Sequence, residues 1–124
     1  MEYNILILMI VAHVLDDFVL QPSCLSNLKQ REWWKQEYPE ELYQYDYIVA
    51  LLVHGFSWSG WILVPWIIYG NPETDLWSLF FLNGLIHSYI DNIKANKRTM
   101  SLMKDQLLHL AQIFITWGIL CAVK

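Results

Sequence analysis

Three histidine–aspartate pairs, each spaced by four residues, lie in apolar stretches of the sequence. The pairs are His13 with Asp17, His87 with Asp91, and Asp105 with His109, and another histidine, His54, lies alone in a further apolar stretch. A spacing of four places both side chains of a pair on one face of a helix. Ionisable groups in apolar surroundings are costly and usually mark a site or a pathway.

Imidazole and carboxylate groups together form the ligand set of zinc and related divalent ions. A bound cation would also compensate carboxylates that are otherwise very costly to desolvate. The sequence therefore predicts a divalent-metal centre, with zinc as the expected ion and manganese or iron as alternatives. The expected ligands, which suffice for two or more ions, are His13, Asp17, His54, His87, Asp91, Asp105 and His109.

A metal ion with an open coordination position lowers the pKa of a bound water towards neutrality and makes that water a nucleophile. Two cations that follow the second pair, Lys94 and Arg98, would hold a substrate phosphate. Gln21 and Asn83 extend the polar faces of two of the helices, and Asp16 is either an additional ligand or an interface charge. The expected catalytic residues are Asp17, Asp91, Asp105 and Lys94.

Simpler interpretations stay open for individual residues. His54 alone could be a hydrogen-bonded packing residue, and Lys94 could neutralise Asp91, which lies three residues before it. Asp105 falls in the first turn of its expected helix, where the helix dipole favours a carboxylate. An ion or proton pathway without fixed metal is the main alternative for the whole set, and a structural polar network is another.

Four apolar stretches position these residues, and a hydrocarbon core of about 30 Å needs roughly 17 to 25 residues to span it. The chain of 124 residues is 56% hydrophobic and only 16% charged. The predicted fold class is all-α: an integral-membrane four-helix bundle that forms a single domain, residues 1–124. A soluble four-helix bundle would need helices with a polar face. The expected spans cover residues 3–20, 47–69, 76–93 and 102–123.

The distribution of positive charge predicts the orientation. One side of the membrane would have Lys124 and an acidic connection that follows a turn at Gly70–Asn71–Pro72. The positive-inside rule therefore places the other two connections in the cytoplasm and both termini outside. The basic residues in or beside those two connections are Lys29, Arg31, Lys35, Lys94, Lys97, Arg98 and Lys104.

The N-terminal apolar stretch is expected to be retained as a membrane segment rather than removed as a signal peptide, since a basic start and a small-residue cleavage site are missing. The long connection between the first two spans, residues 21–46, is rich in aromatic and charged residues, as segments at a membrane interface are. At about 1.5 Å per residue, the aspartates lie roughly one turn and the histidines two turns from the cytoplasmic boundary. All four helices therefore contribute to one polar layer. Close helix packing in the second span is expected at Gly55, Ser57, Ser59 and Gly60.

Composition also argues against some functions. A net charge of -4 disfavours nucleic-acid binding, which requires a basic face. Two cysteines without a CxxC spacing indicate neither a disulfide framework nor a thiolate zinc site. The expected partners are membrane lipids and a small phosphoester substrate, and a homo-oligomer is compatible with the sequence.

Four sequence blocks resemble those of an uncharacterised family of small bacterial and phage membrane proteins. The blocks are "AHVLDDFVLQ", a central histidine, "HSYIDNIK" and "DQLLH", and the resemblance covers essentially the whole chain. It implies that Gln106 belongs to the functional set, together with the pairs, His54, Gln21 and Lys94. Asp16 departs from the family pattern, which has a small residue such as glycine there.

More distantly, the paired helices are similar to inner-membrane metal-dependent hydrolases and to helical zinc-dependent phospholipases C and nucleases. This similarity implies phosphoester hydrolysis. Together with the metal ligands and the charge distribution, it leads to the expectation of a divalent-metal-dependent hydrolase of the bacterial inner membrane, acting on a phospholipid or nucleotide-like phosphoester with its centre near the cytoplasmic face. A proton or metal-ion channel or carrier would instead need polar residues that continue to the outer side. A small regulatory protein acting through a membrane partner would not need the histidines.

Overall fold

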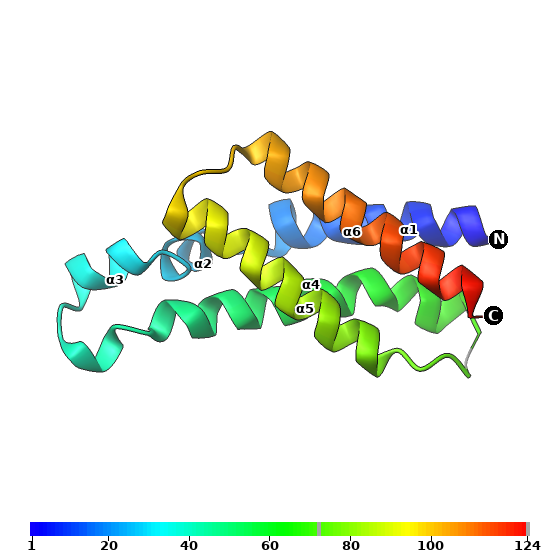
Figure 1. Ribbon diagram of the computed structural model, residues 1–124, viewed down its shortest axis with the longest axis horizontal. Helices are drawn as coiled ribbons and strands as arrows, with labels where there is room; N and C mark the ends of the chain where they lie inside the picture. Colours follow the sequence, from blue (N-terminus) through cyan, green and yellow to red (C-terminus); the bar gives the residue numbers. More distant parts are fainter. Residues whose placement is uncertain (72, 124) are drawn as a thin grey trace.

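The computed structural model describes residues 1–71 and 73–123; Pro72, from the expected turn, and Lys124, from the charge count, lie outside them. The described residues form helices and connections without a strand, so the predicted all-α class is confirmed. Four long helices run side by side (Figure 1). They are α1 (Glu2–Leu15), α4 (Asp46–Tyr69), α5 (Trp77–Asn92) and α6 (Leu102–Ala122).

Three helical stretches are long and apolar enough to cross a membrane: Glu2–Leu20, Glu41–Tyr69 and Leu102–Ala122. The remaining expected span, residues 76–93, is helical as α5, but α5 has 16 residues and is not among the three. At about 1.5 Å per residue it covers roughly 24 Å, which is less than the hydrocarbon thickness. Side chains such as Asn83, Ser88 and Asn92 also lower its hydropathy.

Two of the long helices widen into π-helical segments at the same end of the bundle. Asp16–Leu20 continues α1, and Ile93–Lys97 continues α5. π-Helical turns occur mostly as short insertions and frequently lie at functional sites. Here they contain Asp16, Asp17 and Lys94, so both lie within the candidate site.

The long connection folds as two short helices, α2 (Ser23–Leu28) and α3 (Arg31–Glu37). Asn96 attaches this connection to the end of α5, since its Nδ2 donates to Lys29 O at 3.0 Å and its Oδ1 accepts from Arg31 N at 2.7 Å. Both termini lie at the opposite end of the bundle (Figure 1). The two connections that were expected to face the cytoplasm therefore lie together at the end of the bundle away from the termini.

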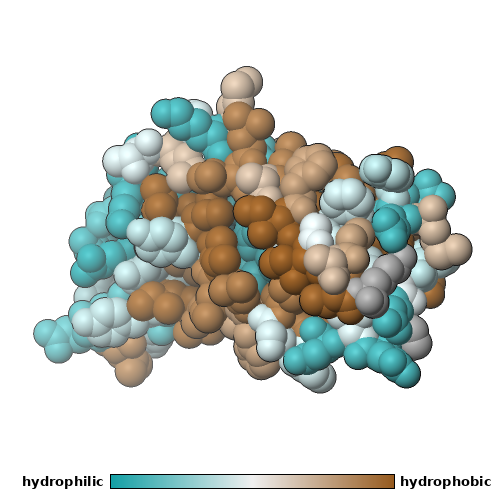
Figure 2. Space-filling model, turned by 45° about the vertical axis from the view of Figure 1, so that its right-hand side comes forward, coloured by the Kyte–Doolittle hydropathy of each residue, from teal (hydrophilic) through white to brown (hydrophobic). Residues whose placement is uncertain are grey.

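The interior is divided into an apolar half and a polar half. The apolar core lies towards the termini and includes Met9, Trp58, Ile62, Trp66 and Ile113. Large apolar side chains on the outside of the bundle are exposed, and they form a band between hydrophilic ends (Figure 2). Such a band is compatible with a surface that faces lipid.

Helices α4 and α5 are in tight contact at Gly55. A Cβ at Gly55 would collide with Ser88 Oγ and lie 2.5 Å from Gly84 O, whereas a Cβ at Gly60 would meet only a Phe80 carbon at 3.8 Å. The close packing expected from the small residues of α4 is therefore found at Gly55, and Gly60 leaves room.

We expect Gly55→Ala to lower the free energy of unfolding by about 1–3 kcal/mol, because the extra methyl group overpacks the contact between α4 and α5. Gly60→Ala is the matched control and should be neutral or stabilising by up to about 1 kcal/mol, since alanine favours the helix. Thermal unfolding of both variants in detergent measures the difference. Equal stability of the two variants would contradict this view of the helix interface.

Candidate metal centre

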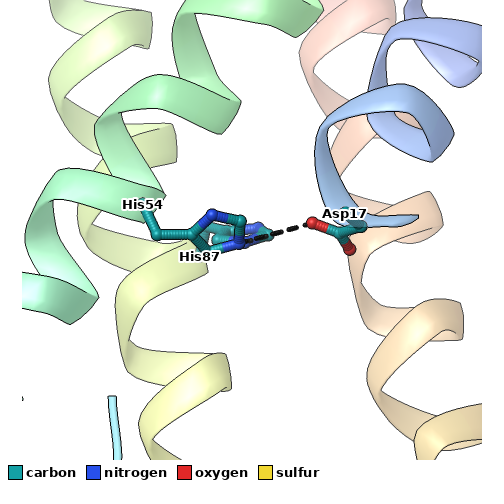
Figure 3. Close-up of side chains that lie close together, drawn as sticks. All are labelled: Asp17, His54 and His87. Atoms are coloured by element: carbon teal, nitrogen blue, oxygen red, sulfur yellow. Dashed lines mark ion pairs between the residues drawn. The ribbon is translucent and has the colours of Figure 1, made fainter. Parts of the chain in front are cut away.

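Side chains from all four long helices meet in one layer at the end of the bundle near α2. His87 and His109 are fully buried, and His54 is 3% exposed. The imidazoles of His54 and His87 lie beside the carboxylate of Asp17, which comes from the opposite helix (Figure 3). The predicted convergence of residues from separate helices is therefore what the structure has.

The first group of donors consists of Asp17, His54 and His87. Asp17 Oδ1 lies 3.4 Å from His54 Nε2 and 3.9 Å from His87 Nε2. One ligand atom from each of the three residues lies within 4.8 Å of the other two. This group joins α1, α4 and α5.

The second group consists of His87, Asp91 and His109, and it meets the same 4.8 Å limit. Asp91 Oδ1 lies 3.4 Å from His109 Nε2 and 3.7 Å from His87 Nε2. Asp105 adjoins this group, with its Oδ1 3.4 Å from His109 Nε2. Four residues of α5 and α6 are thus gathered around one point.

These distances fit a shared cation better than hydrogen bonds. Donors that each lie about 2.1 Å from a tetrahedrally coordinated ion are about 3.4 Å apart. Buried polar atoms normally have hydrogen-bond partners. Within the described part of the chain, four of the atoms that face this centre have none: Asp17 Oδ1, His87 Nε2, Asp105 Oδ1 and His109 Nε2. The buried residues can therefore hold a divalent metal ion.

Two lysines occupy the remaining oxygens of the carboxylates. Lys29 Nζ lies 2.7 Å from Asp91 Oδ2, and Lys94 Nζ lies 2.8 Å from Asp105 Oδ2. Lys29 was not expected from the sequence, because it lies in the connection and in none of the histidine–aspartate motifs. Lys94 neutralises Asp105 rather than Asp91, its neighbour along the chain.

Charge balance points to one divalent ion. The four aspartate side chains of the layer are at most 9% exposed, and two lysines are bonded to them. With neutral imidazoles, two negative charges stay uncompensated. Since uncompensated buried charge is very costly, a single divalent cation would complete the centre.

His13 has a different position from the one predicted. It belongs to neither donor group, and its Nδ1 accepts a 2.9 Å hydrogen bond from Trp58 Nε1. The same imidazole lies 3.5 Å from Asp17 Oδ2. His13 therefore lies beside Asp17 but outside the two groups of donors, with its Nδ1 held as an acceptor by Trp58.

Asp16 and Gln106 also support the donors rather than join them. Asp16 Oδ2 lies 3.6 Å from His54 Nδ1, on the side of the ring opposite the centre, and Ser57 Oγ donates to Asp16 Oδ1 at 3.1 Å. A carboxylate behind a metal-binding histidine orients its ring. Gln106 Nε2 donates to Asp17 Oδ2 at 3.2 Å and thereby links α6 to α1.

A further polar cluster, missed by the sequence analysis, extends the layer towards the apolar core. Gln112 Nε2 donates to Asn83 Oδ1 at 2.8 Å, and Thr116 Oγ1 donates to the same oxygen at 3.0 Å. Gln112 and Thr116 lie three and seven residues after His109, so helical periodicity would have placed them on its face. Asn83, which was expected to extend the face of α5, lies in this cluster instead of among the two groups of donors.

A cavity of about 340 Å³ adjoins the centre. Asp17, His54 and Asp91 line it from the side of the two donor groups, and Gln21 lines it from the end of the π-helical continuation of α1. Its three cations are Lys29, Lys94 and Arg98. A donor cluster beside a cavity with a cationic wall can bind an anion next to a metal ion.

No curated protein and no solved structure matches the chain. The similarity to metal-dependent hydrolases and the phage origin thus have no support from these comparisons. The model of the family described as "Protein of unknown function (DUF3307)" matches residues 5–124. The chain therefore belongs to this family, which confirms the uncharacterised family expected from its sequence blocks.

Proposed function

We propose that the protein is an integral-membrane, divalent-metal-dependent hydrolase of a phosphoester. The observation that carries this proposal is the set of unpartnered, buried imidazole and carboxylate atoms beside a cavity with three cations. Metal ligands and phosphate-binding cations next to one cavity are what a metal-assisted phosphoester hydrolase requires.

In this proposal the protein spans the inner membrane of a bacterium four times, with both termini outside. Helix α5 and its π-helical continuation run from Trp77 to Lys97 and together are long enough to cross the membrane as the third of the four spans along the chain. The basic connections that contain Lys29 and Arg98 would lie in the cytoplasm. The centre would then lie at the depth of the inner leaflet, where a phospholipid or a cytoplasmic phosphoester can reach it.

The second donor group, with Asp105, would hold the ion. A bound divalent ion polarises a phosphoryl oxygen and activates water. Asp17 Oδ1 faces the cavity region without a hydrogen-bond partner among the described residues, so it is placed to accept a proton. Arg98 is exposed at the cavity, and its guanidinium would bind phosphate oxygens in bidentate fashion.

The test is hydrolysis by the purified protein in detergent, with bis(p-nitrophenyl) phosphate and with a phosphatidic acid as substrates. We expect a chelator to abolish hydrolysis and added zinc or manganese to restore it. Asp17→Asn should lower kcat by roughly 10²–10⁴-fold, the usual contribution of a general base. Glu73→Gln, an exposed change in the opposite connection, is the control. Metal-loaded protein that hydrolyses neither substrate, or hydrolysis unaffected by chelator, would count against the proposal.

A proton or ion pathway is the second candidate, because the cluster of Asn83, Gln112 and Thr116 continues the polar layer beyond the histidines. The buried side chains of Ile62, Trp66 and Leu120 lie in the apolar core beyond it. Such a core opposes a continuous polar route through one chain. Ion flux in liposomes that disappears with Asn83→Leu would favour this candidate.

A further inference from the structure

The two donor groups share one atom that can serve only one ion. His87 Nε2 faces both groups, 3.9 Å from Asp17 Oδ1 and 3.7 Å from Asp91 Oδ1, and an imidazole nitrogen has a single lone pair for a metal. If His87 serves the ion held with Asp91 Oδ1 and His109, the other group retains Asp17 Oδ1 and His54 Nε2. Asp91 Oδ2 lies 3.5 Å from His54 Nε2 and completes a second, three-donor place.

A lysine ammonium already lies against that second place. Lys29 Nζ donates to Asp91 Oδ2 at 2.7 Å and to Gln21 Oε1 at 3.3 Å. The Lys29 side chain is only 11% exposed, so its charge needs a close partner. The carboxylate of Asp91 thus lies between two cation positions. Its Oδ1 faces the imidazoles that would hold the metal ion, and its Oδ2 accepts from the ammonium of Lys29.

We propose that Lys29 serves as the second cation of the centre, in the place that a second metal ion would otherwise take. An ammonium has three N–H donors, and two of those of Lys29 are used by Asp91 and Gln21. The third can reach an anionic oxygen in the adjoining cavity, which Lys29 lines. Lys29 is therefore a binding residue for the phosphoryl group of the substrate, a role that rests on the proposed function. The native protein holds one metal ion per chain.

The net charge of the buried layer determines how many divalent ions should bind when Lys29 is replaced. With Lys29 present, two negative charges are left for one divalent ion. Lys29→Met retains most of the side-chain length but leaves Asp91 Oδ2 without its ammonium. The three-donor place then has both room and uncompensated charge, so a second ion should enter.

The experiment is zinc titration of the purified, substrate-free protein in detergent, followed by removal of free zinc and elemental analysis. We expect one zinc per chain in the native protein and in Lys29→Arg, and two in Lys29→Met. Lys35→Met is the matched control, since the Lys35 side chain is 53% exposed and pairs with Glu32, far from the donor groups in charge and burial; its zinc content should stay at one per chain.

Two zinc ions in the native protein, or one in folded Lys29→Met, would overturn the role of Lys29 and leave the metal centre intact. No zinc in the native protein would remove the metal centre and the proposed hydrolase with it. Phosphate binding by Lys29 is tested by inhibition of the hydrolysis of bis(p-nitrophenyl) phosphate, with inorganic phosphate in one arm and phosphatidic-acid vesicles in the other. Each should inhibit the native protein, and the inhibition constant of each should be at least about 10-fold higher in Lys29→Met. Unchanged competition by both would overturn phosphate binding by Lys29.

Discussion

Replacement of His87 with alanine is expected to remove the bound metal almost completely. His87 belongs to both donor groups, and its ring stacks on that of Trp58, with centroids 4.3 Å apart, and on that of His109, with centroids 4.0 Å apart. The loss of a supporting residue outside the ligand set costs roughly 10–100-fold in metal affinity. We expect the loss of this ligand to exceed that range, measured by competition with a zinc-binding dye.

His13→Ala is the matched control, because His13 lies in the same layer but outside both groups. It should lower affinity by roughly 10–100-fold at most, as supporting residues do. His87→Gln repeats the test with less loss of packing volume. Equal affinity of His87→Ala and the native protein would contradict the assignment, and a larger effect of His13→Ala would place the ion elsewhere.

Asp91→Ala is expected to cause the largest loss of stability. Asp91 pairs with Lys29 at 2.7 Å, and the side chains are 7% and 11% exposed. The removal of one member leaves a buried, uncompensated charge, which costs about 3–5 kcal/mol. Thermal or denaturant unfolding in detergent, with chelator present, measures this loss without the contribution of the metal.

The double variant Asp91→Ala/Lys29→Met provides the control. Because it removes both charges, it should recover much of the stability that Asp91→Ala loses. Glu32→Ala, which breaks an exposed pair with Lys35, should change stability by less than about 1 kcal/mol. If the double variant is as unstable as Asp91→Ala, the ammonium of Lys29 is not held by this carboxylate.

The sequence predicted the centre because its signals are local. Pairs spaced by four share a helix face, and the count of turns from the charged ends placed them at one depth. That reasoning brought His54, His87 and His109 together correctly. The apolar runs likewise identified the long helices, although α5 is shorter than the expected span.

The remaining features depend on contacts between segments that are distant in the sequence. His13 has the same spacing as the other pairs, but the rotation of α4 places Trp58 against its Nδ1. Lys29 reaches Asp91, 62 residues away, in a connection that Asn96 holds against the end of α5. The π-helical turns at Asp16 and Ile93 had no recognised signal in the sequence.

The most direct measurement is the anomalous scattering of zinc in crystals of the native protein grown with one equivalent of the ion. We expect one strong peak within about 2.0–2.2 Å of Nε2 of His87, of Nε2 of His109 and of one carboxylate oxygen of Asp91. A peak at Cys24 or Cys121, or none in this layer, would contradict it.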